Sequence, residues 1–239
     1  MNKTQALEAL NHDRARNSFL ISTIEKLQDP EIHAADGSFA VYEPHDSTYL
    51  FSLADGGALA QLKPMLRHEY RSFYVNDLRF APQAEQLYSG AQIQPYLQYY
   101  IESSEFVFDE NELNGGVQIV KLDRSWTDYI LSVYSQSEFS RRDYINECID
   151  TLPCFGALWE GERVGFILVH TNGELGPIAV DERMRGRGIA RTLNQYMFRE
   201  YTRLASIGCL FVLIDNEKSH RLCSASGIKP MGEIMWVNI

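Results

Sequence analysis

The sequence predicts an α/β protein of the α+β kind, with helices packed around mixed sheets. Short apolar runs bounded by turn residues alternate along the chain with apolar residues at helical spacing. The 239 residues are 45% hydrophobic and 23% charged, which is ordinary for a globular protein and excludes disordered or fibrous classes. At about 150 residues per domain, this length fits one large domain or two small ones.

The polar segment DENELNGG, residues 109–116, predicts a domain boundary. Asn-Gly-Gly suits a turn or linker because glycine tolerates positive φ. We therefore expect one domain over residues 1–112 and a second over residues 117–239.

In the N-terminal half, the patterns predict two helices and three strands. The helices are expected over residues 17–26 and 58–66, and the strands over 39–42, 48–53 and 72–75. The aromatic cluster Tyr96, Tyr99 and Tyr100 is assigned to the core or to a domain interface.

The C-terminal half has the clearer pattern. Strands are expected over residues 117–122, 155–159, 163–170, 174–180, 209–214 and 232–237. Helices are expected over residues 126–134, 142–149, 189–204 and 217–226. Asn172-Gly173 between two apolar runs predicts a tight hairpin.

Charge and composition also limit the partners. A formal net charge of −10 makes the chain a poor candidate for nucleic-acid binding, since it repels phosphate overall. The longest apolar run, residues 209–214, is far shorter than the roughly 20 residues of a membrane-spanning helix. The N-terminus shows no signal-peptide core, so we expect a soluble, cytoplasmic protein without a membrane partner. Cys148, Cys154, Cys209 and Cys223 show no metal-ligand spacing, so free thiols and no metal are expected.

Residues 174–190, ELGPIAVDERMRGRGIA, join an apolar strand to an amphipathic helix through a turn rich in arginine and glycine. The unpaired N–H groups of a first helical turn and the positive end of the helix dipole favour an anion. Glycines let a diphosphate approach the backbone closely. Arg183, Arg185 and Arg187 add positive charge, while the GxxxxGK[ST] and GxGxxG loops are absent.

Arg183-x-x-Gly186-x-Gly188 resembles the R/Q-x-x-G-x-G/A signature of the GCN5-related N-acyltransferases, the GNAT superfamily. Asn216, followed eleven residues later by Gly227-Ile228, is similar to the family's N-x(10)-G-F segment, with Ile in place of Phe. The resemblance covers residues 117–239. Over residues 148–180 and 231–237 the sequence looks most like the glycine N-acyltransferase and FR47-like branch.

The resemblance implies a GNAT fold, whose mixed central sheet is splayed between its fourth and fifth strands. Here those strands would be residues 174–180 and 209–215, with the pantetheine arm of coenzyme A between them. The branch pairs its catalytic half with a degenerate acyltransferase-like N-terminal half. We therefore expect residues 1–112 to form a smaller GNAT-like domain without a cofactor site, because they contain no R-x-x-G-x-G.

The resemblance also assigns the contacts with acetyl-CoA, or another acyl-CoA, as co-substrate. Backbone N–H groups of the fourth strand would polarise the thioester carbonyl, and those of the glycine turn would hold the pyrophosphate. The strand residues are Ile178, Ala179 and Val180; the turn residues are Arg183, Arg185, Gly186, Arg187, Gly188, Ile189 and Ala190. Gly176-Pro177 favours a bulge that opens the strand. Asn216 would hold the pantetheine or the edge of the fifth strand, and it can also cap the following helix. His220 or Arg221 would be a further contact for a phosphate.

Acyl transfer to an amine needs a neutral amine, so a base must take a proton. Glu174 stands where members of the family often carry the catalytic glutamate, although a glutamate after an Asn-Gly turn can also be a solvated strand residue. The family's leaving thiolate is usually protonated by a tyrosine seven residues after the motif asparagine, and that position is Cys223. A thiol could donate this proton. A tyrosine from elsewhere, no dedicated acid, or a purely buried role for Cys223 stay open.

The resemblance thus implies an N-acyltransferase, in the first place an N-acetyltransferase, acting on a primary amine of a small molecule such as an amino acid. A non-catalytic coenzyme A-binding or sensing protein is the alternative, because the tyrosine is missing. A third hypothesis makes the N-terminal half an interaction module for a protein substrate. The sequence is also compatible with a homodimer.

Overall fold

The computed structural model describes residues 1–134 and 141–239. The described N-terminal half contains the helices α1 (Lys3–Leu10), α2 (Ser18–Lys26), α3 (Ala58–Leu62) and α4 (Ala81–Leu87), and the strands β1 (Ile32–Ala35), β2 (Ser38–Glu43), β3 (Thr48–Ser52), β4 (Ser72–Val75) and β5 (Gln92–Glu102). The C-terminal half contains the helices α5 (Thr127–Val133), α6 (Arg142–Thr151), α7 (Ile189–Tyr201) and α8 (Glu217–Ala225), and the strands β6 (Gln118–Lys121), β7 (Phe155–Trp159), β8 (Glu162–Val169), β9 (Leu175–Val180), β10 (Ile207–Leu213) and β11 (Lys229–Asn238).

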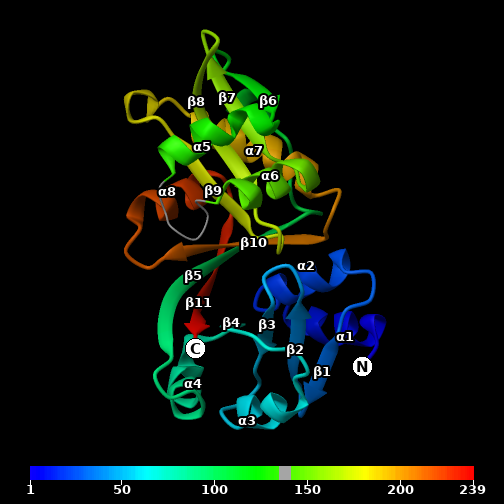
Figure 1. Cartoon of the computed structure of the whole chain (residues 1–239). Helices are drawn as coiled ribbons and strands as arrows, with labels where there is room; N and C mark the ends of the chain where they lie inside the picture. Colours follow the sequence, from blue (N-terminus) through cyan, green and yellow to red (C-terminus); the bar gives the residue numbers. More distant parts are fainter. Residues whose placement is uncertain (135–140) are drawn as a thin grey trace.

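These strands build two sheets, and the predicted mixed α/β class is confirmed. One sheet has the order β1-β2-β3-β4-β11-β5-β10 and the other β6-β7-β8-β9. In Figure 1 the N-terminal half lies below and the C-terminal half above, and β5 and β11 run between them. Among the described residues, no helix is both long and apolar enough to cross a membrane.

The two halves repeat one order of elements. In the N-terminal half, the antiparallel strands β1, β2 and β3 are followed by α3, β4, α4 and β5. In the C-terminal half, the antiparallel strands β7, β8 and β9 are followed by α7, β10, α8 and β11. The division at residues 112–117 is still a prediction, but this repetition is compatible with two related halves.

The halves exchange their last strands. β5 pairs antiparallel with β10 and with β11, whereas β11 pairs antiparallel with β5 and with β4. The last strand of each half therefore lies in hydrogen bonds with strands of the other half. The cores are shared in the same way: Ile207 and Ile234 pack with the α2 side chains Phe19 and Ile21, and Met235 packs with residues of β3 and β4.

Strand β5 was not expected from the sequence, and neither were α1, β1 and α4. Its sequence, QIQPYLQYYIE, carries three glutamines, of which Gln92 and Gln94 are exposed and Gln98 is buried. Gln98 is fully buried because its amide group has partners: it accepts from the Tyr74 hydroxyl and donates to Ser18 Oγ. A buried polar side chain with satisfied hydrogen bonds makes the sequence of a central strand resemble that of a surface segment.

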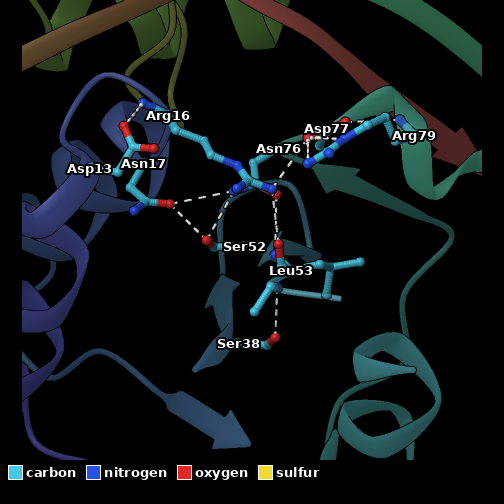
Figure 2. Close-up of polar contacts among 10 residues, drawn as sticks. Asp13, Arg16, Asn17, Ser38, Ser52, Leu53, Asn76, Asp77 and Arg79 are labelled. Carbon is cyan, nitrogen blue, oxygen red and sulfur yellow. Dashed lines mark hydrogen bonds and ion pairs between the residues drawn. The ribbon is translucent and has the colours of Figure 1, made fainter. Parts of the chain in front are cut away.

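In the N-terminal half, the parallel strands β3 and β4 are hydrogen-bonded to each other. Figure 2 shows a polar network that holds their carboxyl ends together. The Asn76 side chain accepts from the Leu53 N–H at 3.1 Å and donates to Ser52 Oγ at 2.9 Å, and Ser52 donates to Asn17 Oδ1 at 2.7 Å. The Arg16 guanidinium donates to the Leu53 carbonyl oxygen at 2.9 Å. The space between these two strands is therefore closed.

Candidate functional site

The equivalent strands of the C-terminal half are not paired. Among the described strands, β9 pairs with β8 alone and β10 pairs with β5 alone. The two strands touch at their amino ends, where a Cβ added to Gly208 would lie 2.9 Å from Leu175 Cδ1. Farther along, Ile178 and Val180 are only partly buried, and Ile214 just beyond β10 is 46% exposed. The predicted splay between the fourth and fifth strands of this half is thus confirmed.

Strand β9 also has the predicted bulge. Ile167 pairs with Ile178 and Val169 pairs with Leu175, so β9 has one residue more than β8 between these pairs. The extra residue falls at Gly176-Pro177, where proline lacks an N–H for the ladder and Gly176 has a φ of 125°. This bulge lies between Glu174 and the strand residues Ile178 to Val180.

A glycine turn leads from β9 into α7. Gly186 and Gly188 have φ values of 76° and 78°, a left-handed conformation that favours glycine. Gly188 is the N-cap of α7, and no side chain caps the helix there. A Cβ at either glycine would meet nothing within 4 Å, so this surface is open. The first N–H groups of α7 and the helix dipole therefore face an accessible place, as anion binding requires.

Arginines border this turn and are accessible. The side chains of Arg183 and Arg185 are 74% and 52% exposed. Arg185 donates to Glu182 at 2.9 Å and to the Val180 carbonyl oxygen at 3.2 Å, and Arg183 lies 3.8 Å from Asp181. Such exposed ion pairs contribute about 0–1 kcal/mol, so the guanidinium groups are available to a phosphate.

The linker between the halves supports the same turn. Asn114 Nδ2 donates to the Arg187 carbonyl oxygen at 2.5 Å, and the Asn114 N–H donates to Thr192 Oγ1 at 2.9 Å. Thr192 in turn donates to the carbonyl oxygen of Gly188 at 3.2 Å. The Arg187 guanidinium lies 5.5 Å from the centre of the Trp159 ring. Asn114 fixes the glycine turn although the sequence pattern marks it only as part of a linker.

Glu174 lies at the amino end of β9, next to the predicted Asn172-Gly173 turn. Its N–H donates to Asn172 Oδ1 at 2.9 Å, and its carbonyl oxygen accepts from the His170 N–H at 2.9 Å. The Glu174 side chain is partly buried. The pKa of the Cys209 thiol on β10 is raised first by the burial of that thiol and second by the charge of the Glu174 carboxylate. The carboxylate thus lies near the ends of β9 and β10 that converge.

Asn216 and Cys223 occupy structural positions on α8. Asn216 is the N-cap of this helix, and its side chain accepts from the Ser219 N–H at 3.2 Å. Cys223 is 4% exposed and belongs to the core beneath α7. Burial raises the pKa of its thiol to about 12, so the group keeps its proton at neutral pH.

A tyrosine from the other half lies near Cys223. Tyr99 of β5 is 4% exposed, and its hydroxyl is 3.0 Å from His220 Nδ1. His220 Nε2 donates to the Ile214 carbonyl oxygen at 3.1 Å. Burial raises the pKa of Tyr99, and Cys223 is the second cause, so these two groups are close enough to interact. His220 thus contacts Tyr99, while Arg221 pairs with Glu217.

A cavity of about 750 Å³ lies beside α7 and the end of α8. Its lining includes Tyr100, Phe106, Arg191, Gln195 and Lys229. The lining also includes Asp109 and Glu105, and Glu105 pairs with Lys229 at 2.6 Å, so the cavity carries charges of both signs. In the described parts of the chain, no group of three or more His, Cys, Asp or Glu residues could hold a metal ion.

The sequence of residues 135–227 matches the acetyltransferase (GNAT) family. The chain carries a GNAT-type N-acetyltransferase domain. This family takes its acyl group from acetyl-CoA, and the predicted superfamily is confirmed. The match includes the glycine turn, α7 and Asn216. No curated protein sequence matches the chain.

Solved structures share the GNAT fold over almost the whole chain. A Drosophila protein has 15% identity and a TM-score of 0.69, and the alignment covers 100% of this chain and 87% of that one. A GCN5-related N-acetyltransferase from Kribbella flavida has 11% identity and a TM-score of 0.59, with 94% and 95% covered. A tandem GNAT protein from the clavulanic acid biosynthesis pathway has 12% identity and a TM-score of 0.54, with 99% and 93% covered. The fold therefore extends through both halves.

Proposed function

We propose that the protein is an N-acetyltransferase that transfers the acetyl group of acetyl-CoA to the primary amine of a small molecule, with Glu174 as general base. The observation that carries this proposal is one continuous segment, β9 to α7. It joins a partly buried carboxylate, a bulged edge strand and an uncapped glycine turn. A carboxylate and an open glycine turn at the two ends of one edge strand support acid–base chemistry and anion binding in the same site.

The residues fit acetyl-CoA, which brings the reactive thioester. The open glycine turn at Gly186 and Gly188, with the N–H groups through Ala190, would hold the pyrophosphate. Arg183 and Arg185 would exchange their surface carboxylates for phosphate oxygens. Along the unpaired edge of β9, backbone groups of residues 178–180 would bind the pantetheine arm and polarise the thioester carbonyl.

Glu174 would take a proton from the amine, directly or through a water molecule, as the nitrogen attacks the carbonyl carbon. The carbon–sulfur bond then breaks, and the sulfur needs a proton. Cys223 is one donor, because its thiol stays protonated. Tyr99 is the second, because its hydroxyl is in the same core and is held by His220. Y99F and C223A variants distinguish the two donors by their turnover.

A thiol-release assay tests the proposal, with acetyl-CoA and longer acyl-CoAs offered with free amino acids, polyamines and peptides. The four cysteines of the chain are all buried, so a thiol reagent reports mainly released coenzyme A. With an accepted amine, E174Q is expected to lower kcat about 10²- to 10⁴-fold, the usual contribution of a general base, with little change in the KM for acetyl-CoA. E162Q, on an exposed residue of β8, is the control and keeps wild-type kcat.

A non-catalytic coenzyme A-binding protein is the alternative function. At one hundred times its dissociation constant, a ligand specific for the folded state adds about 2.7 kcal/mol of stability, so acetyl-CoA should raise the Tm. A raised Tm with no turnover on any amine would favour the binding protein. No change of Tm at millimolar acetyl-CoA would contradict both proposals. Placement in the glycine N-acyltransferase and FR47-like branch is part of the proposal, and turnover with glycine would support it.

A further inference from the structure

The turn that precedes Glu174 is held by side chains of the N-terminal half. Lys26 is the last residue of α2, and its Nζ donates to the Asn172 carbonyl oxygen at 3.0 Å. The next carbonyl oxygen, that of Gly173, accepts from the Tyr201 hydroxyl of α7 at 2.9 Å. The two halves thus each bind one carbonyl group of the same turn.

A second contact reaches the Glu174 backbone through one side chain. Asp46, in the turn between β2 and β3, accepts from Asn172 Nδ2 at 2.9 Å and from Thr171 Oγ1 at 3.5 Å. Because the amide nitrogen of Asn172 faces Asp46, its Oδ1 faces the other way and accepts the Glu174 N–H. Asp46 therefore sets the orientation of the amide group that holds Glu174.

The turn has a shape that accommodates Lys26. Gly173 has a φ of 89°, and a Cβ there would lie 1.4 Å from Lys26 Nζ. Glycine is thus required twice, by the backbone conformation and by the lysine that packs against it. The Asn-Gly pair, which the sequence marks only as a hairpin, is also a contact surface between the halves.

The surroundings of Lys26 give its charge a local role. The ammonium group is buried, which lowers its pKa to about 8, and Glu43 and Glu25 act in the opposite direction. Lys26 and Glu174 both influence the buried thiol of Cys209, with opposite signs. The lysine charge and the Glu174 carboxylate are therefore both close to the same β10 residue.

We propose that Lys26 and Asp46 are positioning residues, through which the N-terminal half fixes Glu174 at the start of β9 for acyl transfer. This inference rests on the proposed function, in which Glu174 accepts a proton from the amine. It assigns the N-terminal half a role in catalysis without a cofactor site of its own. Neither residue touches the reacting atoms; each acts through the Asn172 turn.

Hydrogen exchange measures the contact without any substrate. In K26M and in D46A, the amides of Gly173 and Glu174 are expected to exchange at least tenfold faster than in the wild type. Amides in the middle of α7 should keep their rates. K3M is the matched control, because Lys3 Nζ donates to the Leu27 carbonyl oxygen at 2.7 Å and to the Glu25 carbonyl oxygen at the same end of α2. It removes a lysine–carbonyl contact that stays within the N-terminal half, and the Glu174 amide should be unaffected.

Steady-state kinetics then test the effect on catalysis. A displacement of about 1 Å at a catalytic group can cost 10²-fold, so K26M and D46A are expected to lower kcat about 10- to 100-fold. The KM for acetyl-CoA and the Tm increase caused by acetyl-CoA should stay within twofold of the wild type, since the glycine turn is unchanged. K26R, which can still donate to the Asn172 carbonyl group, should recover part of the loss.

Each result has one meaning. Unchanged exchange at Gly173 and Glu174 in both variants would overturn the contact, and faster exchange with wild-type kcat would overturn its role in positioning. If K3M lowers kcat as much as K26M, the loss reflects general destabilisation and the inference is wrong. A wild-type chain that turns over no amine refutes the proposed function instead, and the exchange data then decide whether the N-terminal half holds the turn.

Discussion

The exchanged strands predict that residues 117–239 do not fold alone. Without residues 1–112, β10 loses β5, its partner among the described strands, and β11 loses both β4 and β5. Ile207, Ile234, Met235 and Val237 are fully buried, and the side chains that cover them come largely from the N-terminal half. Burying one such side chain contributes about 1.5–3 kcal/mol, so exposing these four costs about 6–12 kcal/mol. A whole domain has only about 5–15 kcal/mol of stability.

Circular dichroism, thermal unfolding and size-exclusion chromatography of the isolated segment measure this effect. We expect no cooperative transition for residues 117–239 and recovery of one when residues 1–112 are co-expressed. A full chain carrying a protease site after Asp109 is the control, since cleavage there leaves both halves and Asn114 in place. A monomeric 117–239 segment with a cooperative transition and a Tm that acetyl-CoA raises would refute the argument from strand exchange.

Two further predictions concern the glycine turn and a buried histidine. Gly188→Ala places a Cβ at a φ of 78°, which costs about 1–2 kcal/mol, so we expect a lower Tm and weaker acetyl-CoA binding by calorimetry. Gly161→Ala, at a φ of 85° in the β7–β8 turn, is the control and should lower the Tm alone. Equal losses of acetyl-CoA binding in both variants would contradict the assignment of the glycine turn to cofactor binding. His170 shares a hydrogen bond with Tyr144, and burial lowers the pKa of His170 to about 3. Between pH 3 and pH 6.5, the ordinary pKa of histidine, the unfolded chain binds more protons than the folded chain. The free energy of unfolding therefore falls as pH falls, by about 2 kcal/mol at pH 5. Denaturant unfolding from pH 7 to 4 should show a shallower loss for H170Q, and identical slopes would refute the prediction.

The sequence predicts best where the physical cause is local. The glycine turn is recognisable because its left-handed φ values at Gly186 and Gly188 restrict the residue type, and the Asn172-Gly173 turn is recognisable for the same reason. The bulge at Gly176-Pro177 follows from a missing N–H. These features place the segment from Glu174 to α7 without knowledge of the rest of the chain.

The remaining parts of the site depend on contacts between distant segments. Tyr99 was assigned to the core or an interface, and it is buried on a strand that the sequence did not reveal. Lys26 ends a correctly predicted helix, but nothing near it in the sequence shows that its ammonium group reaches Asn172, 146 residues away. Asp46 and Asn114 lie in polar turns, where such residues are common for local reasons.

The two strand pairs β3–β4 and β9–β10 explain how a repeated fold can leave one candidate site. In the N-terminal half the pair is hydrogen-bonded and closed by Asn76, whereas in the C-terminal half it is open and the glycine turn follows. The closed half still supplies β5, which completes the sheet beside β10, and the side chains that hold the Glu174 turn. A mutation that weakened the N-terminal half would therefore expose the core of the other half and release Glu174 together. We therefore expect the N-terminal half to be indispensable even though its own strand pair is closed.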